Sequence, residues 1–254
     1  MITIREYLKA ASLEEAWNAN QKRPNRVLGG MGWMKMSSGN VSTAIDLSGL
    51  SLDQIEETDD AFIVGAMATL RQFETHEGLE RYFHGAVRES VRHIVGVQFR
   101  NCATIGGSVW LRAGFSDPLT LLLALDCTVE LYQGGEQTVQ IPIAEFCRMK
   151  PDNSILTAVH IRKTGRQIAY QSFRNTETDF QVLAVAVSRL DGSYCAAVGA
   201  RPTRAMEVNA EQVEELIEKA QALPYGDNLR ASAEYRRMLA GVLIRRAADE
   251  LERR

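Results

Sequence analysis

Two glycine-rich turns are the segments of this 254-residue chain whose residue types best suit ligand-binding chemistry. The first is Leu28-Gly29-Gly30-Met31-Gly32-Trp33, and the second is Thr104-Ile105-Gly106-Gly107-Ser108. Glycine adopts backbone conformations that other residues avoid, and its missing side chain lets a ligand approach the backbone. Successive N–H groups in such turns form a concave nest for anions. Two nests that face each other could hold a pyrophosphate, with further hydrogen bonds from the Thr104 and Ser108 hydroxyls.

Residue types alone do not identify the ligand. A Gly-Gly pair is also the ordinary makeup of a turn that binds nothing, and both interpretations stay open at this point. The Rossmann pattern is absent because Gly30-Met31-Gly32 is followed by Trp33-Met34-Lys35, so that the third glycine is missing. No Walker loop is present either. The patterns therefore predict two phosphate-binding turns and leave the nucleotide unnamed.

The remaining reactive side chains suggest neither a catalytic centre nor a metal site. The four histidines form no constellation, so we expect no general base among His76, His84, His93 and His160. The four cysteines form no C-x-x-C pair and have no histidine at ligand spacing, which argues against zinc and iron–sulfur clusters. We expect buried free thiols at Cys102, Cys127, Cys147 and Cys195.

Composition narrows the class of protein. A hydrophobic content of 45% is enough for a core in one or two domains. The formal net charge of -3 gives no electrostatic reason to expect a nucleic-acid partner. No apolar run reaches the roughly 18 residues of a membrane span. Residues 1–7 do not resemble a secretory signal, so we expect a cytoplasmic protein.

Several elements must position the two turns. A strand over 25–28 ends at the first turn, and further strands are expected over 43–47 and 62–65. Thr69 and Gln72 have the spacing of a capping box, and a helix is expected over 79–93. Asp117 is expected to cap a core helix whose first residue is Pro118.

The second half of the chain reads mostly as strands followed by helices. Gly134-Gly135 predicts a hairpin between 128–132 and 138–141. Residues 182–188 suit a strand or a helix equally well. The pattern is α+β without a long βαβ series. We expect one domain over 1–155 and another over 156–254, with strands over 155–161, 167–173 and 194–198 and helices over 210–222 and 232–254.

Residues 98–108 read Q-F-R-N-C-A-T-I-G-G-S, and this stretch resembles a known signature. The flavin subunits of the molybdopterin dehydrogenases, which include xanthine dehydrogenase and carbon monoxide dehydrogenase, typically read Q-I-R-N-x-A-T-I-G-G-N there. Other stretches resemble segments of the same family, in the same order along the chain. Residues 27–30 resemble its A-G-G-T loop, residues 116–126 resemble the segment that carries its flavin-contacting aspartate, and residues 173–180 resemble its R-x-x-x-D-I stretch. Residues 199–205 resemble its G-x-x-P-x-R-A turn, and residues 235–243 resemble its closing helix.

The resemblance implies a fold and a cofactor. The fold is α+β: an FAD-binding domain of two small α/β subdomains, as in vanillyl-alcohol oxidase-like proteins, and a C-terminal α+β domain with an antiparallel sheet. The FAD pyrophosphate is expected between a first loop of Leu28, Gly29, Gly30, Met31, Gly32 and Trp33 and a second loop of Thr104, Ile105, Gly106, Gly107 and Ser108. Asp117 is expected to hydrogen-bond the flavin or its polyol chain.

The resemblance also implies a role. The chain would be the FAD-binding electron-transfer subunit of a molybdenum hydroxylase. Its expected partners are a molybdopterin-binding large subunit and a [2Fe–2S] small subunit, with NAD+ or another acceptor taking the electrons. This chain departs from the family at Met31 and Ser108, which replace the usual Thr or Ser and the common Asn. Those departures motivate an alternative, a structural subunit that binds no FAD. A self-contained flavin oxidase is a third hypothesis, although no separate substrate domain is evident.

Overall fold

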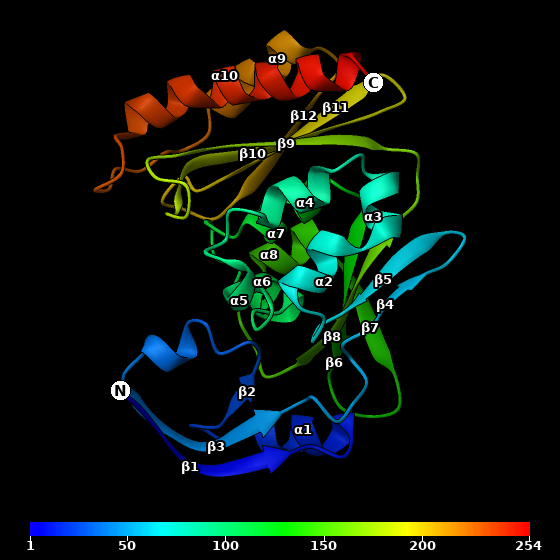
Figure 1. Cartoon of the computed structure of the whole chain (residues 1–254), viewed down its shortest axis with the longest axis vertical. Coiled ribbons are helices and arrows are strands. Elements are labelled where there is room, and N and C mark those ends of the chain that lie inside the picture. Colours follow the sequence, from blue (N-terminus) through cyan, green and yellow to red (C-terminus); the bar gives the residue numbers. More distant parts are fainter.

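The computed structural model describes residues 1–254, and its three parts are stacked along the long axis of the molecule (Figure 1). An N-terminal part lies at one end, a part rich in short helices lies in the middle, and a sheet covered by two long helices lies at the other end. The expected α+β architecture, with two small subdomains and a C-terminal antiparallel sheet, is confirmed.

The N-terminal part is a three-stranded parallel sheet with the order β1-β3-β2. Its elements are β1 (Ile2–Lys9), α1 (Leu13–Asn20), β2 (Arg26–Leu28), a 3-10 helix η1 (Met34–Met36) and β3 (Gly39–Asp46). The buried side-chain amide of Asn25 ties the start of β2 to α1 and β3, because it donates to the Ala19 carbonyl and accepts from the Thr43 N–H at 2.8 and 3.1 Å. This positions the first glycine turn, which follows β2.

The middle part is a five-stranded antiparallel sheet with the order β4-β5-β8-β6-β7. Its strands are β4 (Ile55–Glu57), β5 (Ala61–Gly65), β6 (Cys127–Tyr132), β7 (Thr138–Pro142) and β8 (Ile155–Arg162), and its helices are α2 (Leu70–Thr75), α3 (Glu77–Tyr82), α4 (Ala86–Val91), α5 (Val97–Arg100), α6 (Ile105–Trp110), α7 (Asp117–Leu123) and α8 (Ile143–Arg148). The capping box of Thr69 with Gln72 and the hairpin of β6 with β7 are both confirmed.

The single helix expected over 79–93 is wrong. The chain forms α3 and α4 instead, and it turns between them at His84 and Gly85, whose φ angles are +49° and +85°. Glycine adopts this left-handed conformation at low cost. The apolar period that suggested one helix is shared by two short helices that pack on the same core.

The structure also bears on the domain boundary expected between residues 155 and 156. Strand β8 begins at Ile155 and lies between β5 and β6, at the centre of the middle sheet. A boundary at its first residue would divide that sheet. We propose that the boundary lies instead in residues 163–166, between β8 and β9.

The C-terminal part is a four-stranded antiparallel sheet with the order β12-β11-β10-β9. It contains β9 (Gln167–Arg174), β10 (Gln181–Leu190), β11 (Ser193–Gly199) and β12 (Met206–Ala210), followed by α9 (Val213–Gln221) and α10 (Ala233–Glu252). Residues 182–188 are therefore strand. All of them are buried because one sheet face packs on the middle part and the other on α10, which explains their unbroken apolar pattern.

The cysteines differ in burial. Cys127, Cys147 and Cys195 are buried as expected, and burial raises the pKa of the Cys147 thiol to about 11 and that of Cys195 to about 12. Cys102 is exposed, so the expectation was wrong there. It lies in the turn directly before the second glycine motif. No helix has the length and apolarity that crossing a membrane would require.

A buried ion pair holds the segment that leads into the second glycine motif. Arg100, at the end of α5, donates from Nε and Nη2 to the Glu74 carboxylate at 2.8 and 3.2 Å, and both side chains are 6% exposed. Burial alone would raise the pKa of Glu74, but the hydrogen bonds from Arg100 and Arg71 outweigh it and lower the pKa. Arg71 is the exposed partner of the same carboxylate.

We expect Glu74→Ala to lower the free energy of unfolding by about 3–5 kcal/mol, because it leaves the Arg100 guanidinium buried and unpaired. Arg71→Ala is the matched control and should cost less than about 1 kcal/mol, as for other exposed pairs. Urea denaturation checks both. Because the folded-state pKa of Glu74 is lowered, the pair should stabilise the protein above the ordinary carboxyl pKa and lose this effect as the pH falls through the lowered value. Equal losses in the two variants would contradict this account.

Candidate functional site

The first glycine turn presents a row of unused backbone donors. None of the N–H groups from Gly29 to Trp33 has a hydrogen-bond acceptor within the chain. Met31 has a φ of +60°, the left-handed conformation that turns successive N–H groups toward one side. The carbonyls of Met31 and Trp33 are used, since they accept from Lys35 and Met36 in the 3-10 helix that follows. The turn therefore has the free donors that an anion nest requires.

The second glycine motif packs directly against the first. A Cβ on Gly30 would lie 1.9 Å from the Cys102 carbonyl oxygen, and a Cβ on Gly29 would lie 3.0 Å from the Thr104 Oγ1. No side chain fits at Gly30 without moving backbone. The expectation that two sequence-distant glycine turns meet at one place therefore agrees with the structure.

The second motif does not itself form the expected nest. Thr104 caps α6, and its side chain accepts from the Gly107 N–H at 3.1 Å. The N–H groups of Ile105 and Gly106 donate to the Ala68 and Ala66 carbonyls, and that of Ser108 donates to Thr104. The Ser108 hydroxyl also donates to the Thr104 carbonyl, at 2.9 Å. This motif is a capped helix start that packs against the first turn. Contacts between its residues and the cofactor remain a prediction.

Asp117 is not a helix cap, contrary to expectation. Ser116 caps α7, and its side chain accepts from the Leu119 N–H. Asp117 is 4% exposed, and its Oδ1 accepts from the Tyr170 hydroxyl and, at 2.8 Å, from the Arg174 Nη2. Burial raises the pKa of Asp117, and the positive charge of Arg174 opposes that rise. This carboxyl joins α7 to the C-terminal sheet, and its contact with flavin remains a prediction.

An aromatic cluster lies where the three parts of the molecule meet. Trp33 comes from the first glycine turn, Phe115 from the loop before α7, and Phe180 from the loop between β9 and β10. Ring centroids lie 5.4 Å apart for Trp33 and Phe115, 5.6 Å for Trp33 and Phe180, and 5.0 Å for Phe115 and Phe180. All three are exposed, at 45, 39 and 39% respectively. Sequence reasoning named only Trp33, because nothing in local spacing connects the other two to it.

Charged side chains fasten the loop that carries Phe180. Arg174 donates to the Asp179 carbonyl at 2.7 Å, and Asp179 pairs with Arg230 at 2.6 Å. The hydrogen bond from Arg230 lowers the pKa of Asp179. The Arg230 guanidinium also lies 5.1 Å from the Phe180 ring centroid. Residues 173–180, which resemble the family's R-x-x-x-D-I stretch, thus position one ring of the aromatic cluster.

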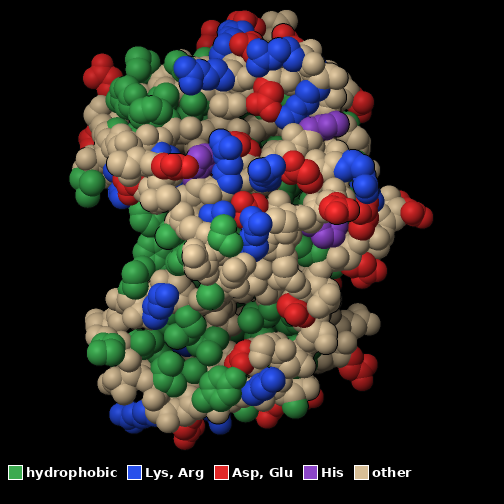
Figure 2. All heavy atoms as spheres, viewed as in Figure 1, with side chains coloured by type: hydrophobic (Ala, Val, Ile, Leu, Met, Phe, Trp, Pro, Cys, Tyr) green, Lys and Arg blue, Asp and Glu red, His purple; other side chains and the backbone are tan.

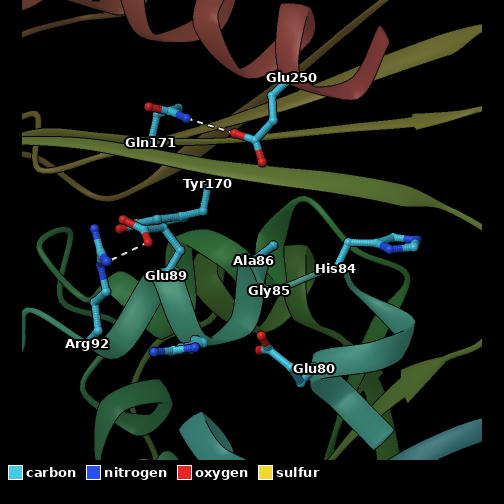
Figure 3. Close-up of a pocket in the computed structure, with 10 residues that line it drawn as sticks. Glu80, His84, Gly85, Ala86, Glu89, Arg92, Tyr170, Gln171 and Glu250 are labelled. Atoms are coloured by element: carbon cyan, nitrogen blue, oxygen red, sulfur yellow. Dashed lines mark hydrogen bonds and ion pairs between the residues drawn. The ribbon is translucent and has the colours of Figure 1, made fainter. Parts of the chain in front are cut away.

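Two concave pockets lie elsewhere. One, of about 410 Å³, lies between α3 and α4 on one side and β9 and α10 on the other (Figure 3). Its walls carry the hydrogen-bonded pair Gln171–Glu250 and the ion pair Glu89–Arg92, each 2.9 Å long. The other, of about 700 Å³, is lined by residues of β1, β3 and the segment after α1. Neither pocket contains a residue of a glycine turn. We therefore locate the candidate site by the free backbone amides of the first turn and not by the shape of the surface.

Surface composition differs between the junctions of the three parts. Figure 2 shows hydrophobic side chains gathered over the N-terminal part and along its border with the middle part. Charged side chains crowd the border between the middle and C-terminal parts, on the side of α3 and α4.

Comparison with known proteins identifies the family. Residues 3–163 match the family described as the FAD binding domain in molybdopterin dehydrogenase. This match spans more than half of the chain, and the chain belongs to that family. The expected family, the FAD cofactor and the class of oxidoreductase subunit are confirmed.

Individual relatives match over nearly their whole length. The chain is 28% identical over 252 residues to the uncharacterized protein YgfM of Escherichia coli strain K12, covering 95% of this chain and 94% of that protein. It is 26% identical over 272 residues to the nicotine 6-hydroxylase medium subunit of Paenarthrobacter nicotinovorans, covering 96% of each. A structure of carbon monoxide dehydrogenase from Hydrogenophaga pseudoflava shares the fold, with a TM-score of 0.85, 20% identity and coverage of 97 and 96%.

We expect Gly30→Ala to abolish or severely weaken FAD binding, because the new Cβ would displace the first turn from the Cys102 carbonyl. Gly96→Ala is the matched control near the second motif, since its Cβ would meet only the flexible Gln98 side chain, at 3.4 Å. Isothermal titration of the flavin-free chain with FAD measures the effect. Wild-type affinity in Gly30→Ala would show that the close contact is not required.

Proposed function

We propose that this chain is the flavin subunit of a molybdenum hydroxylase complex and works in the cytoplasm. In that role it receives electrons from the [2Fe–2S] clusters of a small partner subunit, after a large molybdopterin-binding subunit has oxidised the substrate. It passes them to NAD+ or another acceptor. The nicotine 6-hydroxylase medium subunit, which matches over 96% of its length, supports a place within a complex of several subunits.

The residues present fit FAD. A pyrophosphate needs several hydrogen-bond donors close together, and the N–H groups of Gly29 to Trp33 provide them without breaking any bond within the chain. Glycine at positions 29 and 30 leaves the backbone of the turn without side chains. This row of free amides is the single observation that carries the proposal, because none of these N–H groups is bonded within the chain and all of them are available to donate to one bound anion.

The protein supplies position and electrostatics for the cofactor. Bound FAD would supply the ability to take up and release two electrons. The first turn would hold the pyrophosphate, while Cys102, Thr104 and Gly107 pack directly against that turn. Met31 carries no hydroxyl, so the anion is held by the backbone alone at this position. A backbone nest binds phosphate without a side chain, which makes the Met31 departure compatible with FAD.

The direct test is a visible absorption spectrum of the purified chain before and after FAD is added, with the released cofactor identified after denaturation. We expect a bound-flavin spectrum and released FAD. No flavin in the isolated chain, and none in the chain reconstituted with its partners, would favour the structural subunit that binds no FAD.

A second measurement tests the assembly. Native protein should co-purify with iron- and molybdenum-containing subunits. Isolation alone under gentle conditions, together with substrate oxidation by the lone flavin-loaded chain, would favour the self-contained flavin oxidase instead.

A further inference from the structure

The pocket that α3 and α4 form with β9 and α10 has a strongly polar lining (Figure 3). Its volume of about 410 Å³ lies within the range of roughly 300–1,000 Å³ that is usual for small-molecule sites. Only two of its ten lining residues are hydrophobic, Ala86 and Tyr170. The Tyr170 hydroxyl already donates to Asp117, so that it is not available to a ligand. The lining therefore suits a small, charged molecule.

Glu80, on α3, carries a carboxylate that has no partner in the chain. Its Oε2 is buried and accepts no hydrogen bond. A Cβ on Gly85 would lie 3.5 Å from its Oε1, so the carboxylate lies beside a residue that has no side chain to offer. A buried polar atom without a partner is costly, and the cost is higher for a charged group. A positively charged donor within the pocket would remove this cost.

The other two carboxylates of the pocket are already paired. Glu89 pairs with Arg92 at 2.9 Å. Glu250 accepts from the Gln171 amide, also at 2.9 Å, and forms an ion pair with Arg254. Figure 3 shows the first of these pairs on one wall of the pocket and the Gln171–Glu250 hydrogen bond on the opposite wall. The unpaired negative charge is therefore confined to Glu80.

Arg254 also holds the two walls of the pocket together. It donates to the Ile168 carbonyl of β9 at 2.7 Å and to the His84 carbonyl of the turn between α3 and α4 at 3.3 Å. These bonds fasten the turn that follows Glu80 to the C-terminal sheet. The pocket is thus formed before a ligand arrives, which lowers the entropic cost of binding.

Arg88, on α4, supplies an unpaired charge of the opposite sign. It lines the pocket and is exposed, and it forms no ion pair, whereas Arg81 and Arg92 before and after it each pair with a glutamate. A guanidinium binds a carboxylate well because two parallel N–H groups can donate to its two oxygens. Glu80 and Arg88 do not pair with each other, so the pocket presents one negative and one positive group to a ligand.

We infer that this pocket binds a small zwitterion, an α-amino acid, whose ammonium group donates to Glu80 and whose carboxylate accepts from Arg88. A ligand with a single charge would leave one of the two side chains unpaired. A metal ion is not suited to the pocket, because the chain contains no group of three or more side chains arranged to hold one. The inference does not depend on the proposed function, since no lining residue belongs to a glycine turn.

The first test measures the melting temperature of the full chain with each of the common α-amino acids in excess. A ligand that binds only the folded chain raises this temperature, more so as its concentration exceeds its Kd. We expect at least one amino acid to do so. That amino acid is then titrated calorimetrically beside its C-terminal amide, which lacks the carboxylate, and its N-acetyl form, which lacks the ammonium group. Each derivative should bind about tenfold to a hundredfold more weakly, as expected when a charged hydrogen bond is lost.

Two variants assign the ends of the ligand. Glu80→Gln and Arg88→Gln should each weaken binding of the amino acid by a similar factor. Arg88→Gln should cause no further loss for the amide, and Glu80→Gln should cause none for the N-acetyl form, because the matching charge is already missing. Glu77→Gln and Arg81→Gln are the matched controls, since both residues are exposed on α3 and neither lines the pocket. They should leave binding unchanged.

Each remaining outcome overturns the inference. These are the absence of stabilisation by every amino acid, equal stabilisation of the wild type and of Glu80→Gln, and an equal loss for acid and amide in Arg88→Gln. Without ligand, Glu80→Gln should keep or raise the melting temperature, because it removes an unpaired buried charge. A clear fall would show that the chain itself uses this carboxylate. FAD binding should be the same in all these variants, so the two sites are tested separately.

Discussion

The contact between the two glycine motifs is the constraint on which the rest of the site depends. Gly30 lies so close to the Cys102 carbonyl that a Cβ would be 1.9 Å from it. This contact joins the parallel N-terminal sheet to the antiparallel middle sheet, and it leaves the amides of the first turn free of bonds within the chain. The backbone N–H groups of the second motif are already hydrogen-bonded within the chain at the start of α6, where Thr104 is the cap. One motif therefore offers donors, and the other holds it in place.

Two polar links extend this arrangement to the whole molecule. The buried pair of Arg100 with Glu74 ties the segment before the second motif to α2. The buried contact of Asp117 with Tyr170 and Arg174 ties α7 to β9 in the C-terminal sheet. The second link brings the Phe180 loop to the same junction as Phe115 and Trp33. A site made from three parts of the chain is therefore positioned by a few buried interactions, and neither of the two surface pockets described above includes a residue of its glycine turns.

Sequence reasoning reached the parts of this site that depend on local chemistry. The capping box at Thr69 and the glycine hairpin follow from spacings within a few residues, and both were predicted correctly. Strand β1 was not predicted, because Ile2–Lys9 is largely exposed and is defined by parallel pairing with β3, about forty residues away. The same limit explains why the partners of Asp117 were missed: the cap is its neighbour Ser116, and Tyr170 and Arg174 come from a distant strand. It also explains the aromatic cluster, whose three rings share no sequence pattern.

Amide NMR of the isotope-labelled chain during titration with FAD would test the central claim most directly, namely that the free amides of the first turn hold the cofactor pyrophosphate. The account predicts that the N–H resonances of Gly29 to Trp33 shift together on binding and become protected from exchange with solvent. The N–H resonances of Ile105 to Ser108, already bonded within the chain, should shift less. FAD binding that leaves the resonances of Gly29 to Trp33 unmoved would contradict the account.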